Sequence, residues 1–247
     1  MHDARTIPAL ARFRRVDIRM KDPHTWLQPR SWMRQWFIHN PNRYTDYFAW
    51  LLKRSRLKSR QIRLTGDITP SYAGLKAESF ERIKTAFAER GVRTRALFIM
   101  RDPIERFLSQ QRMQLRKRGL LRPDHETEHL RKASIKLLKR ASPRSDYPAT
   151  IDALRSGLVD SEVFIGLYET LFTEQTHSAL CRHLAIPEQT PDLTHKVNAS
   201  QATAEVPTDV LQRLGQHFAP LVTAVQDRCP DLAIEQHWDT AITWREA

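Results

Sequence analysis

Glycine is scarce in this chain, and its scarcity excludes the commonest phosphate-binding loops. The seven glycines stand singly, at positions 66, 74, 91, 119, 157, 166 and 215. Neither Gly-x-Gly-x-x-Gly nor Gly-x-x-x-x-Gly-Lys, the patterns that link a strand to a helix around a phosphate, occurs at any of them. A nucleotide-cradling loop of either kind is therefore excluded within this sequence.

Cysteines and long apolar runs are also few. Cys181 and Cys229 lack both a Cys-x-x-Cys motif and the histidine spacing of a zinc site, so we expect free thiols and no metal. No apolar run approaches the roughly 20 residues that span a bilayer. Charges interrupt the N-terminal residues every few positions, unlike the core of a secretory signal. We therefore expect no membrane span and a cytoplasmic protein.

Positive charge is abundant. The chain has 40 Lys and Arg against 28 Asp and Glu, a formal net charge of +12. This charge predicts attraction to polyanions, whether nucleic acid, acidic lipid, a phosphorylated cofactor or a sulfated or carboxylated substrate, and does not choose among them. The length of 247 residues is normal for one α/β domain, and we expect a single domain over residues 1–247.

Apolar patterning predicts strands that alternate with helices. Three short runs are typical of buried strands: Gln61–Leu64, Arg95–Met100 and Glu162–Leu167. Helical spacing predicts helices over 76–91, 103–119 and 174–185, and a pair over 208–228 that Pro220 bends or separates. This order predicts the α/β class, with a parallel sheet and helices on both faces. Such sheets bind ligands at the carboxyl ends of their strands.

The segment Arg112–Arg140 is densely basic around an acidic cluster at Asp124–Glu128. Runs of charge usually form a solvated surface, here a helix-loop-helix. The alternative interpretation of this segment is a surface that binds an acidic acceptor. Aromatic residues, on which single-stranded nucleic acid stacks, are missing from this segment. Nucleic-acid binding is therefore the less favoured interpretation of its charge.

The stretch LFIMRDPIERFLSQ, Leu97–Gln110, passes from a strand into a helix at Arg-Asp-Pro. Asp102 is placed to cap the helix and Pro103 occupies its first position. One interpretation is an anion site, where Arg101 and Ser109 join the N–H groups of the helix N-terminus. The other is a capped helix whose Arg101 pairs with a neighbouring carboxylate. The motif alone does not decide between them.

Two further polar stretches accompany this motif. The first is TGDITPSYAGL, which follows the first predicted strand and contains a proline-fixed turn at Gly66–Tyr72. The second is KDPHTW at Lys21–Trp26, which places a cation, a carboxylate and an imidazole within four residues of loop-like sequence.

Together these stretches resemble the sulfotransferase family that uses 3′-phosphoadenosine 5′-phosphosulfate (PAPS), in particular its heparan-sulfate-type and bacterial members. In that family a strand ends in Arg-[Asp/Asn]-Pro, and a serine eight residues after the arginine helps it hold the cofactor's 3′-phosphate. The matching residues here are Arg101 and Ser109. Gly66–Tyr72 is similar to the family's Gly-Glu-x-[Thr/Ser]-Pro-x-Tyr turn, with Asp67 in place of glutamate.

KDPHTW resembles the family's Lys-Glu-x-x-aromatic-aromatic element, whose glutamate is the general base in heparan-type members. The resemblance implies that Asp22 is the base and that Lys21 or His24 assists it. The downstream stretch IGLYETLFTEQTHSALCRHLAI is similar to the family's strand, Tyr-Glu-x-Leu and following helix, and HKVNAS to a later loop. The matches extend over Lys21–Ser200. They imply a P-loop-NTPase-like three-layer fold around a central parallel sheet.

The implied reaction moves a sulfuryl group from PAPS to a hydroxyl or amine of a carbohydrate or small-molecule acceptor, without a metal. Such a transfer needs a base for the acceptor proton and cations for the charge that spreads over the sulfuryl oxygens. A carboxylate with an ordinary pKa is a weak base at neutral pH, so we expect burial or Asp67 to raise the pKa of Asp22. Aspartate also reaches one methylene less far than glutamate.

The sequence departs from the family at its start. Family members begin with a strand and a phosphosulfate loop, Lys-x-Gly-Thr-[Thr/Ser], whereas this sequence matches from the following helix onward. We expect a natural protein that extends further, or else a degenerate member that binds PAP or a polyanion without turnover; a basic nucleic-acid-binding domain is a third alternative. Met113 stands where some members have a histidine, and the basic residues that some members supply from a C-terminal loop have no clear match unless Lys196 serves.

Overall fold

The computed structural model describes residues 37, 39–55, 62–139, 145–188, 190 and 202–245. Contacts between residues divide the chain into two compact units. One comprises Met1–Thr69 and Leu75–Thr94, and the other Pro70–Gly74 and Arg95–Ala247. A single domain over residues 1–247 stays a prediction.

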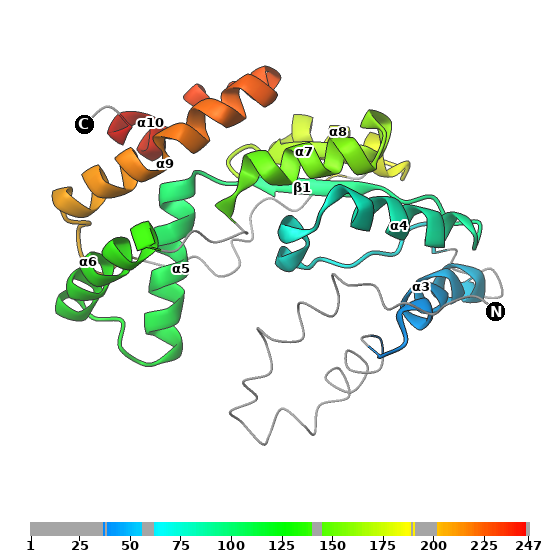
Figure 1. The fold of residues 1–247 in the computed structure, drawn as a ribbon, viewed down its shortest axis with the longest axis horizontal. Helices are drawn as coiled ribbons and strands as arrows, with labels where there is room; N and C mark the ends of the chain where they lie inside the picture. The colour runs from blue at the N-terminus through cyan, green and yellow to red at the C-terminus, as the bar shows by residue number, and fades with distance from the viewer. Residues whose placement is uncertain are drawn as a thin grey trace. The chain divides into compact units, whose positions relative to one another are not determined.

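In the first unit, two helices pack through aromatic side chains. They are α3 (Pro41–Ser55) and α4 (Ala77–Ala88), drawn in blue and cyan in Figure 1. The ring centroids of Tyr44, Phe48 and Phe87 lie 4.9–6.4 Å apart. The rings meet edge to face, the arrangement that the quadrupole of an aromatic ring favours. Gly91 follows α4 with a φ of 69°, a left-handed conformation that glycine adopts without strain, and this confirms the expected end of the helix.

The sheet described in the second unit has two parallel strands, β1 (Ala96–Met100) and β2 (Val163–Leu167). Ala96 lies opposite Val163 and Met100 opposite Leu167. Two of the three predicted strands and their parallel pairing are thus confirmed. Because the strands are in register and point the same way, their carboxyl ends lie side by side.

The chain between the strands forms three helices. They are α5 (Pro103–Lys117), α6 (Pro123–Lys139) and α7 (Tyr147–Gly157), followed by the short 3₁₀ turn η4 (Asp160–Glu162). The helix expected after Arg101 is confirmed, and the basic segment forms the expected helix-loop-helix. Its surface is only partly solvated, because Glu126, Leu130 and Ser134 of α6 are fully buried.

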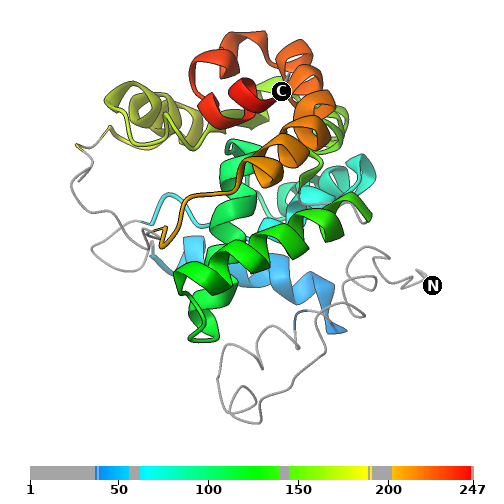
Figure 2. The same ribbon diagram turned by 90° about the vertical axis from the view of Figure 1, so that its left-hand side faces the viewer.

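The hydrophobic core of the second unit surrounds α9 (Thr208–Arg228), which lies beside α10 (Asp239–Trp244) in both ribbon views (Figures 1 and 2). The 3₁₀ turns η5 (Pro230–Leu232) and η6 (Ile234–Gln236) connect them, and α8 (Glu174–Leu184) follows β2 as predicted. An added Cβ at Gly215 would lie 1.8 Å from the carbonyl oxygen of Trp244. Only glycine therefore lets the two helices approach this closely. The core comprises Met100, Ile104, Leu108, Leu130, Tyr147, Ile151, Leu167, Leu214, Val222 and Trp238 among others.

The predicted helix pair over 208–228 is wrong, because α9 runs through Pro220 as one helix. A proline inside a helix costs about 3 kcal/mol. One face of α9 buries five large apolar side chains, each worth roughly 1.5–3 kcal/mol, and their burial outweighs this cost. These residues are Val210, Leu214, Phe218, Val222 and Val225.

The strand predicted at Gln61–Leu64 is wrong over its described part, since residues 62–69 have no regular secondary structure. Ile62 and Leu64 are 47% and 42% exposed, so the segment has no buried face to hold it in a sheet. The described residues are thus mostly helical around a small parallel sheet, which is broadly the α/β class.

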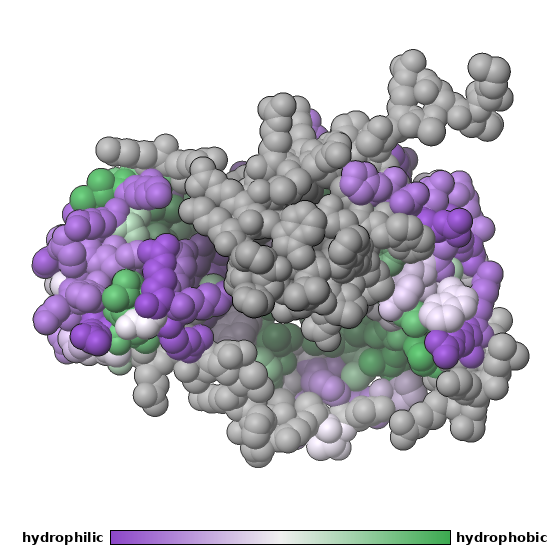
Figure 3. Space-filling model, turned by 90° about the horizontal axis from the view of Figure 1, so that it is seen from below, coloured by the Kyte–Doolittle hydropathy of each residue, from purple (hydrophilic) through white to green (hydrophobic). Residues whose placement is uncertain are grey.

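Hydrophilic side chains cover most of the described surface at the two ends of the view in Figure 3, with apolar residues scattered among them. Within the described ranges, none of the helices combines the length and the apolar character needed to cross a bilayer.

Glu126 on α6 is a fully buried carboxylate with several donors. Arg112 Nε donates to its Oε1 at 2.6 Å, and the Thr203 backbone N–H donates to its Oε2 at 2.9 Å. The Thr203 hydroxyl donates to the same Oε2. Burial acts to raise the pKa of Glu126, but the hydrogen bonds from Thr203 and Arg112 together lower it. The ionised group therefore ties α5, α6 and the chain before α9 together.

Replacing Glu126 by glutamine is expected to reduce the free energy of unfolding by about 2–3 kcal/mol at pH 7, because it leaves Arg112 without its charged partner. A carboxylate whose folded-state pKa is lowered stabilises the fold above its unfolded value of 4.5, and loses this contribution as the pH falls below that value. The difference between variant and wild type in urea denaturation should therefore shrink from pH 7 to pH 3.5. Glu128→Gln, at an exposed position on the same helix, is the control, and a pH-independent difference would contradict the assignment.

Candidate functional site at the carboxyl edge of the parallel strands

The carboxyl ends of β1 and β2 place two polar pairs next to each other. Arg101 and Asp102 leave β1 while Tyr168 and Glu169 leave β2, directly after the paired residues Met100 and Leu167. The Tyr168 backbone N–H donates to the Met100 carbonyl oxygen at 2.6 Å, which extends the pairing by one residue. The edge where an α/β sheet is expected to bind ligands thus carries an arginine, an aromatic ring and two carboxylates.

Arg101 is partly exposed and only loosely paired. Its guanidinium lies over the Tyr168 ring, 5.0 Å from the centroid, in the geometry of a cation–π contact. Its Nη2 lies 3.6 Å from Oε2 of Glu105, one turn into α5, and the Arg101 side chain is 30% exposed. An ion pair this long and this exposed contributes little. Among the described residues, the guanidinium therefore contacts one ring and one distant carboxylate, and it retains N–H donors for an anion.

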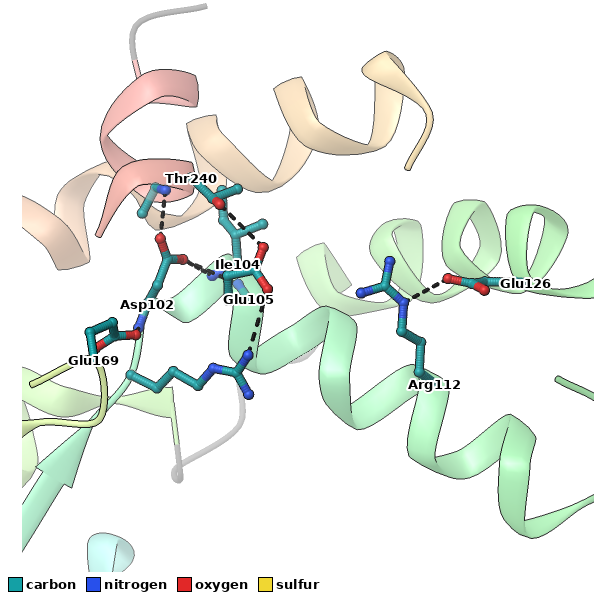
Figure 4. Close-up of polar contacts among 9 residues, drawn as sticks. Asp102, Ile104, Glu105, Arg112, Glu126, Glu169 and Thr240 are labelled. Atoms are coloured by element: carbon teal, nitrogen blue, oxygen red, sulfur yellow. Dashed lines mark hydrogen bonds and ion pairs between the residues drawn. The ribbon is translucent and has the colours of Figure 1, made fainter. Parts of the chain in front are cut away.

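Asp102 performs the capping role that the sequence predicts. Its Oδ1 accepts from the N–H groups of Ile104 and Glu105, at 2.8 and 3.1 Å, and its Oδ2 accepts from the Ala241 N–H at 2.9 Å (Figure 4). Burial raises the pKa of Asp102, while these three hydrogen bonds act to lower it. The carboxylate therefore fastens α10 to the start of α5.

This cap changes the expectation for the helix N-terminus. The N–H groups of Ile104 and Glu105 are bonded to Asp102 Oδ1, and that of Arg106 is bonded to the Asp102 carbonyl oxygen. Pro103 has no N–H. The unpaired donors that the anion-site interpretation expected are thus already used at this N-terminus. An anion beside Arg101 would be bound by side chains.

Ser109 lies two turns into α5 and is half-buried. The i, i+4 spacing of a helix puts Glu105 and Ser109 on the same side, the side that Glu105 shares with Arg101. Glu105 is held there by two contacts, to Arg101 through Oε2 and to the Thr240 hydroxyl through Oε1 at 3.2 Å (Figure 4). The structure thus contains features of both interpretations of the motif. Arg101 pairs with the carboxylate of Glu105, as the capped-helix interpretation expects, but the pair is weak, and Ser109 lies on the same side of the helix, as the anion-site interpretation expects.

Glu169 is the residue of this edge to which the sequence assigned no role. Its Oε1 accepts from the Asp102 backbone N–H at 2.9 Å. Its Oε2 is buried, and no described residue donates a hydrogen bond to it. Burial raises the pKa of Glu169, and the charge of Asp102 adds to this effect. Tyr168 and Glu169 were recognisable as part of Tyr-Glu-x-Leu, and parallel strands of equal length place such residues beside Arg101.

The other predicted site residues belong to other parts of the chain. Lys21, Asp22 and His24 lie outside the described residues, as does Lys196. Asp67 belongs to the first unit, where its Oδ2 accepts from the Tyr44 hydroxyl at 2.9 Å and its Oδ1 from the Thr69 hydroxyl at 2.8 Å. The rest of this turn, from Pro70, forms the 3₁₀ helix η2 (Pro70–Gly74). The Thr150 hydroxyl donates to the Ala73 carbonyl oxygen of η2 at 2.7 Å.

The histidines, cysteines and carboxylates of the described residues form no group of three or more that could hold a metal ion. Cys181 and Cys229 are free thiols, as expected, and both are buried. Comparison with models of known protein families, with curated proteins and with solved structures finds no match for this chain.

Proposed function

We propose that this protein is a PAPS-dependent sulfotransferase that moves a sulfuryl group to a hydroxyl or amine of a carbohydrate or small-molecule acceptor. The proposal includes a P-loop-NTPase-like three-layer fold, of which β1 and β2 would be neighbouring strands. The observation that carries it is the partly exposed Arg101 at the carboxyl end of a parallel strand, held on Tyr168 and followed by Ser109 on α5.

The residues of the edge suit a phosphate group. A guanidinium presents a fork of N–H donors to two phosphate oxygens, and each charge-assisted hydrogen bond contributes roughly 1.5–3 kcal/mol. Arg101 would supply this fork to the 3′-phosphate of the cofactor, and Ser109 a hydroxyl. Glu105 would give up its 3.6 Å contact with Arg101, at little cost because the pair is partly exposed.

The chemical step is assigned by the resemblance to the element Lys21–Trp26. Asp22 would take the acceptor proton, and Lys21 or His24 would support it by charge or proton relay. PAPS, when bound, supplies the sulfuryl group together with a bisphosphorylated leaving group. The binding part of the proposal depends on Arg101, whereas the catalytic part depends on Asp22, and the two are therefore separable by experiment.

The proposed activity is tested by incubating the protein with sulfur-labelled PAPS and a panel of carbohydrate and amine acceptors. We expect label on an acceptor, with the same yield in a chelator, because the proposed transfer needs no metal. Asp22→Asn should reduce the rate about 100-fold or more, since one positioned general base contributes 10²–10⁴, while PAP binding is retained. PAP binding without any transfer would support the non-catalytic alternative, and absence of PAP binding would refute the proposal.

A further inference from the structure

One peptide group at the edge is held by side chains on both of its polar atoms. It is the peptide between Arg101 and Asp102. Its carbonyl oxygen, on Arg101, accepts from the Tyr147 hydroxyl at 2.9 Å, and its N–H, on Asp102, donates to Glu169 Oε1 at 2.9 Å. The two polar atoms of this peptide are thus bonded by side chains, Tyr147 from α7 and Glu169 from the end of β2.

The orientation of this peptide sets the direction in which the Arg101 side chain leaves the strand. It is the link between the last residue pair of the sheet and the Asp102 cap, and rotation about its flanking bonds would carry the Arg101 Cα and Cβ with it. Tyr147 is 2% exposed, so its hydroxyl is fixed in the core. Glu169 binds the other polar atom of the peptide, the Asp102 N–H. Its neighbour Tyr168 contacts the Arg101 guanidinium through its ring.

Among the described residues, no cationic side chain pairs with Glu169, so an ion pair does not account for its burial. No described residue pairs with its Oε2. The indole N–H of Trp238 acts to lower the pKa of Glu169, and it too is buried without a hydrogen-bond partner among the described residues. A buried carboxylate oxygen without a partner is costly. Glu169 is therefore better explained by what its other oxygen holds.

We propose that Glu169 is a positioning residue for anion binding, which holds the Arg101–Asp102 peptide so that the guanidinium faces the ligand. The inference rests on the proposed function of Arg101 and goes beyond it, because Glu169 itself would not touch the ligand. It also predicts that loss of the Glu169 side chain weakens anion binding, the opposite of what the loss of its negative charge alone would do. Removing a negative charge beside an anion site should by itself strengthen anion binding, whereas loss of the positioning contact should weaken it.

The test measures PAP affinity by calorimetry, well below the thermal midpoint of each variant. Glu169→Leu removes the acceptor and should weaken PAP binding about tenfold, the scale on which small misplacements of a binding group act. Glu169→Gln removes the charge but keeps a carbonyl acceptor for the Asp102 N–H, so it should bind PAP at least as tightly as the wild type. Tyr147→Phe removes the hydroxyl that holds the other atom of the same peptide, and should also weaken binding with no change of charge.

Glu126→Gln is the matched control, because it replaces another buried, hydrogen-bonded glutamate and should lower stability while leaving PAP affinity unchanged. If Arg101→Ala weakens binding but Glu169→Leu and Tyr147→Phe do not, the positioning role is wrong and the proposed phosphate site stands. If Arg101→Ala binds PAP like the wild type, both are wrong. Tighter binding by Glu169→Leu would show that its charge alone acts at the site. Tyr147→Phe decides the question if the leucine variant does not fold.

Discussion

Replacement of Arg101 by alanine is expected to weaken PAP binding by about 100-fold, the largest effect on PAP affinity that any single substitution should have. Loss of two charge-assisted hydrogen bonds of roughly 1.5 kcal/mol each would lower the binding free energy by about 3 kcal/mol, which corresponds to that factor. Thermal unfolding with and without PAP measures it, because a ligand that binds the folded state raises the midpoint. In Arg101→Ala the increase should disappear at PAP concentrations that stabilise the wild type.

Arg116→Ala is the control for charge. Arg116 is exposed near the end of the same helix, so its loss changes the net charge of the protein by the same amount without touching the strand edge. PAP should stabilise this variant as it does the wild type. Equal losses in the two variants would indicate diffuse attraction by a protein of net charge +12, and would contradict a defined phosphate site.

Replacement of Asp102 by alanine should have the largest effect on stability at the site. The Asp102 carboxylate accepts three backbone N–H groups and is 2% exposed. An N-cap contributes about 1 kcal/mol, and an unsatisfied buried N–H at Ala241 costs about 1–3 kcal/mol more. We expect a loss of about 3 kcal/mol in the free energy of unfolding, with a decrease of roughly 6–12 °C in the thermal midpoint.

Asp146→Ala separates the cap from the long-range bond. Asp146 caps α7 and accepts from the Ala149 N–H at 3.1 Å, so its loss should cost only about 1 kcal/mol. The stability of Asp102→Asn should fall between those of the two alanine variants. The carbonyl of the asparagine amide still caps α5, but its NH₂ group faces the Ala241 N–H and cannot accept a hydrogen bond from it. Equal losses for the two alanine variants would show that the Ala241 bond does not stabilise the attachment of α10.

The local features of the edge were predictable from the sequence. Arg-Asp-Pro after an apolar run indicates a strand end, an N-cap and a first helical turn within three residues, and all three are found. Likewise, parallel pairing of β1 and β2 follows from the alternation of strands and helices. The features at Arg-Asp-Pro depend on residues close together in the chain, where propensity and spacing act directly. The pairing of the two strands depends only on the order of the elements.

The long-range contacts of the same residues were not predictable. Asp102 bonds the N–H of Ala241, 139 residues away, and donates to Glu169, 67 residues away. Backbone donors carry no residue-specific signal, so no pattern could indicate that Asp102 would use them. The same limit applies to Glu126, which appears in the sequence as one charge in a charged segment but is fully buried against Arg112 and Thr203.

The two mistaken elements were errors of context. The alternation in Gln61–Leu64 suits a strand, but a strand needs a buried face, and Ile62 and Leu64 are about half exposed. Pro220 indicates a helix break, but the burial of the residues on one face of α9 outweighs its local cost. In both cases tertiary packing, which a single sequence does not display, decides the local structure.

Calorimetric titration of the protein with PAP and with 5′-AMP tests the central claim most directly. The two nucleotides differ by the 3′-phosphate that Arg101 and Ser109 are proposed to hold. We predict that PAP binds at least about 30-fold more tightly than 5′-AMP in the wild type, and that Arg101→Ala removes most of this preference. Equal affinity of the wild type for the two nucleotides, or a preference that persists in Arg101→Ala, would contradict the account.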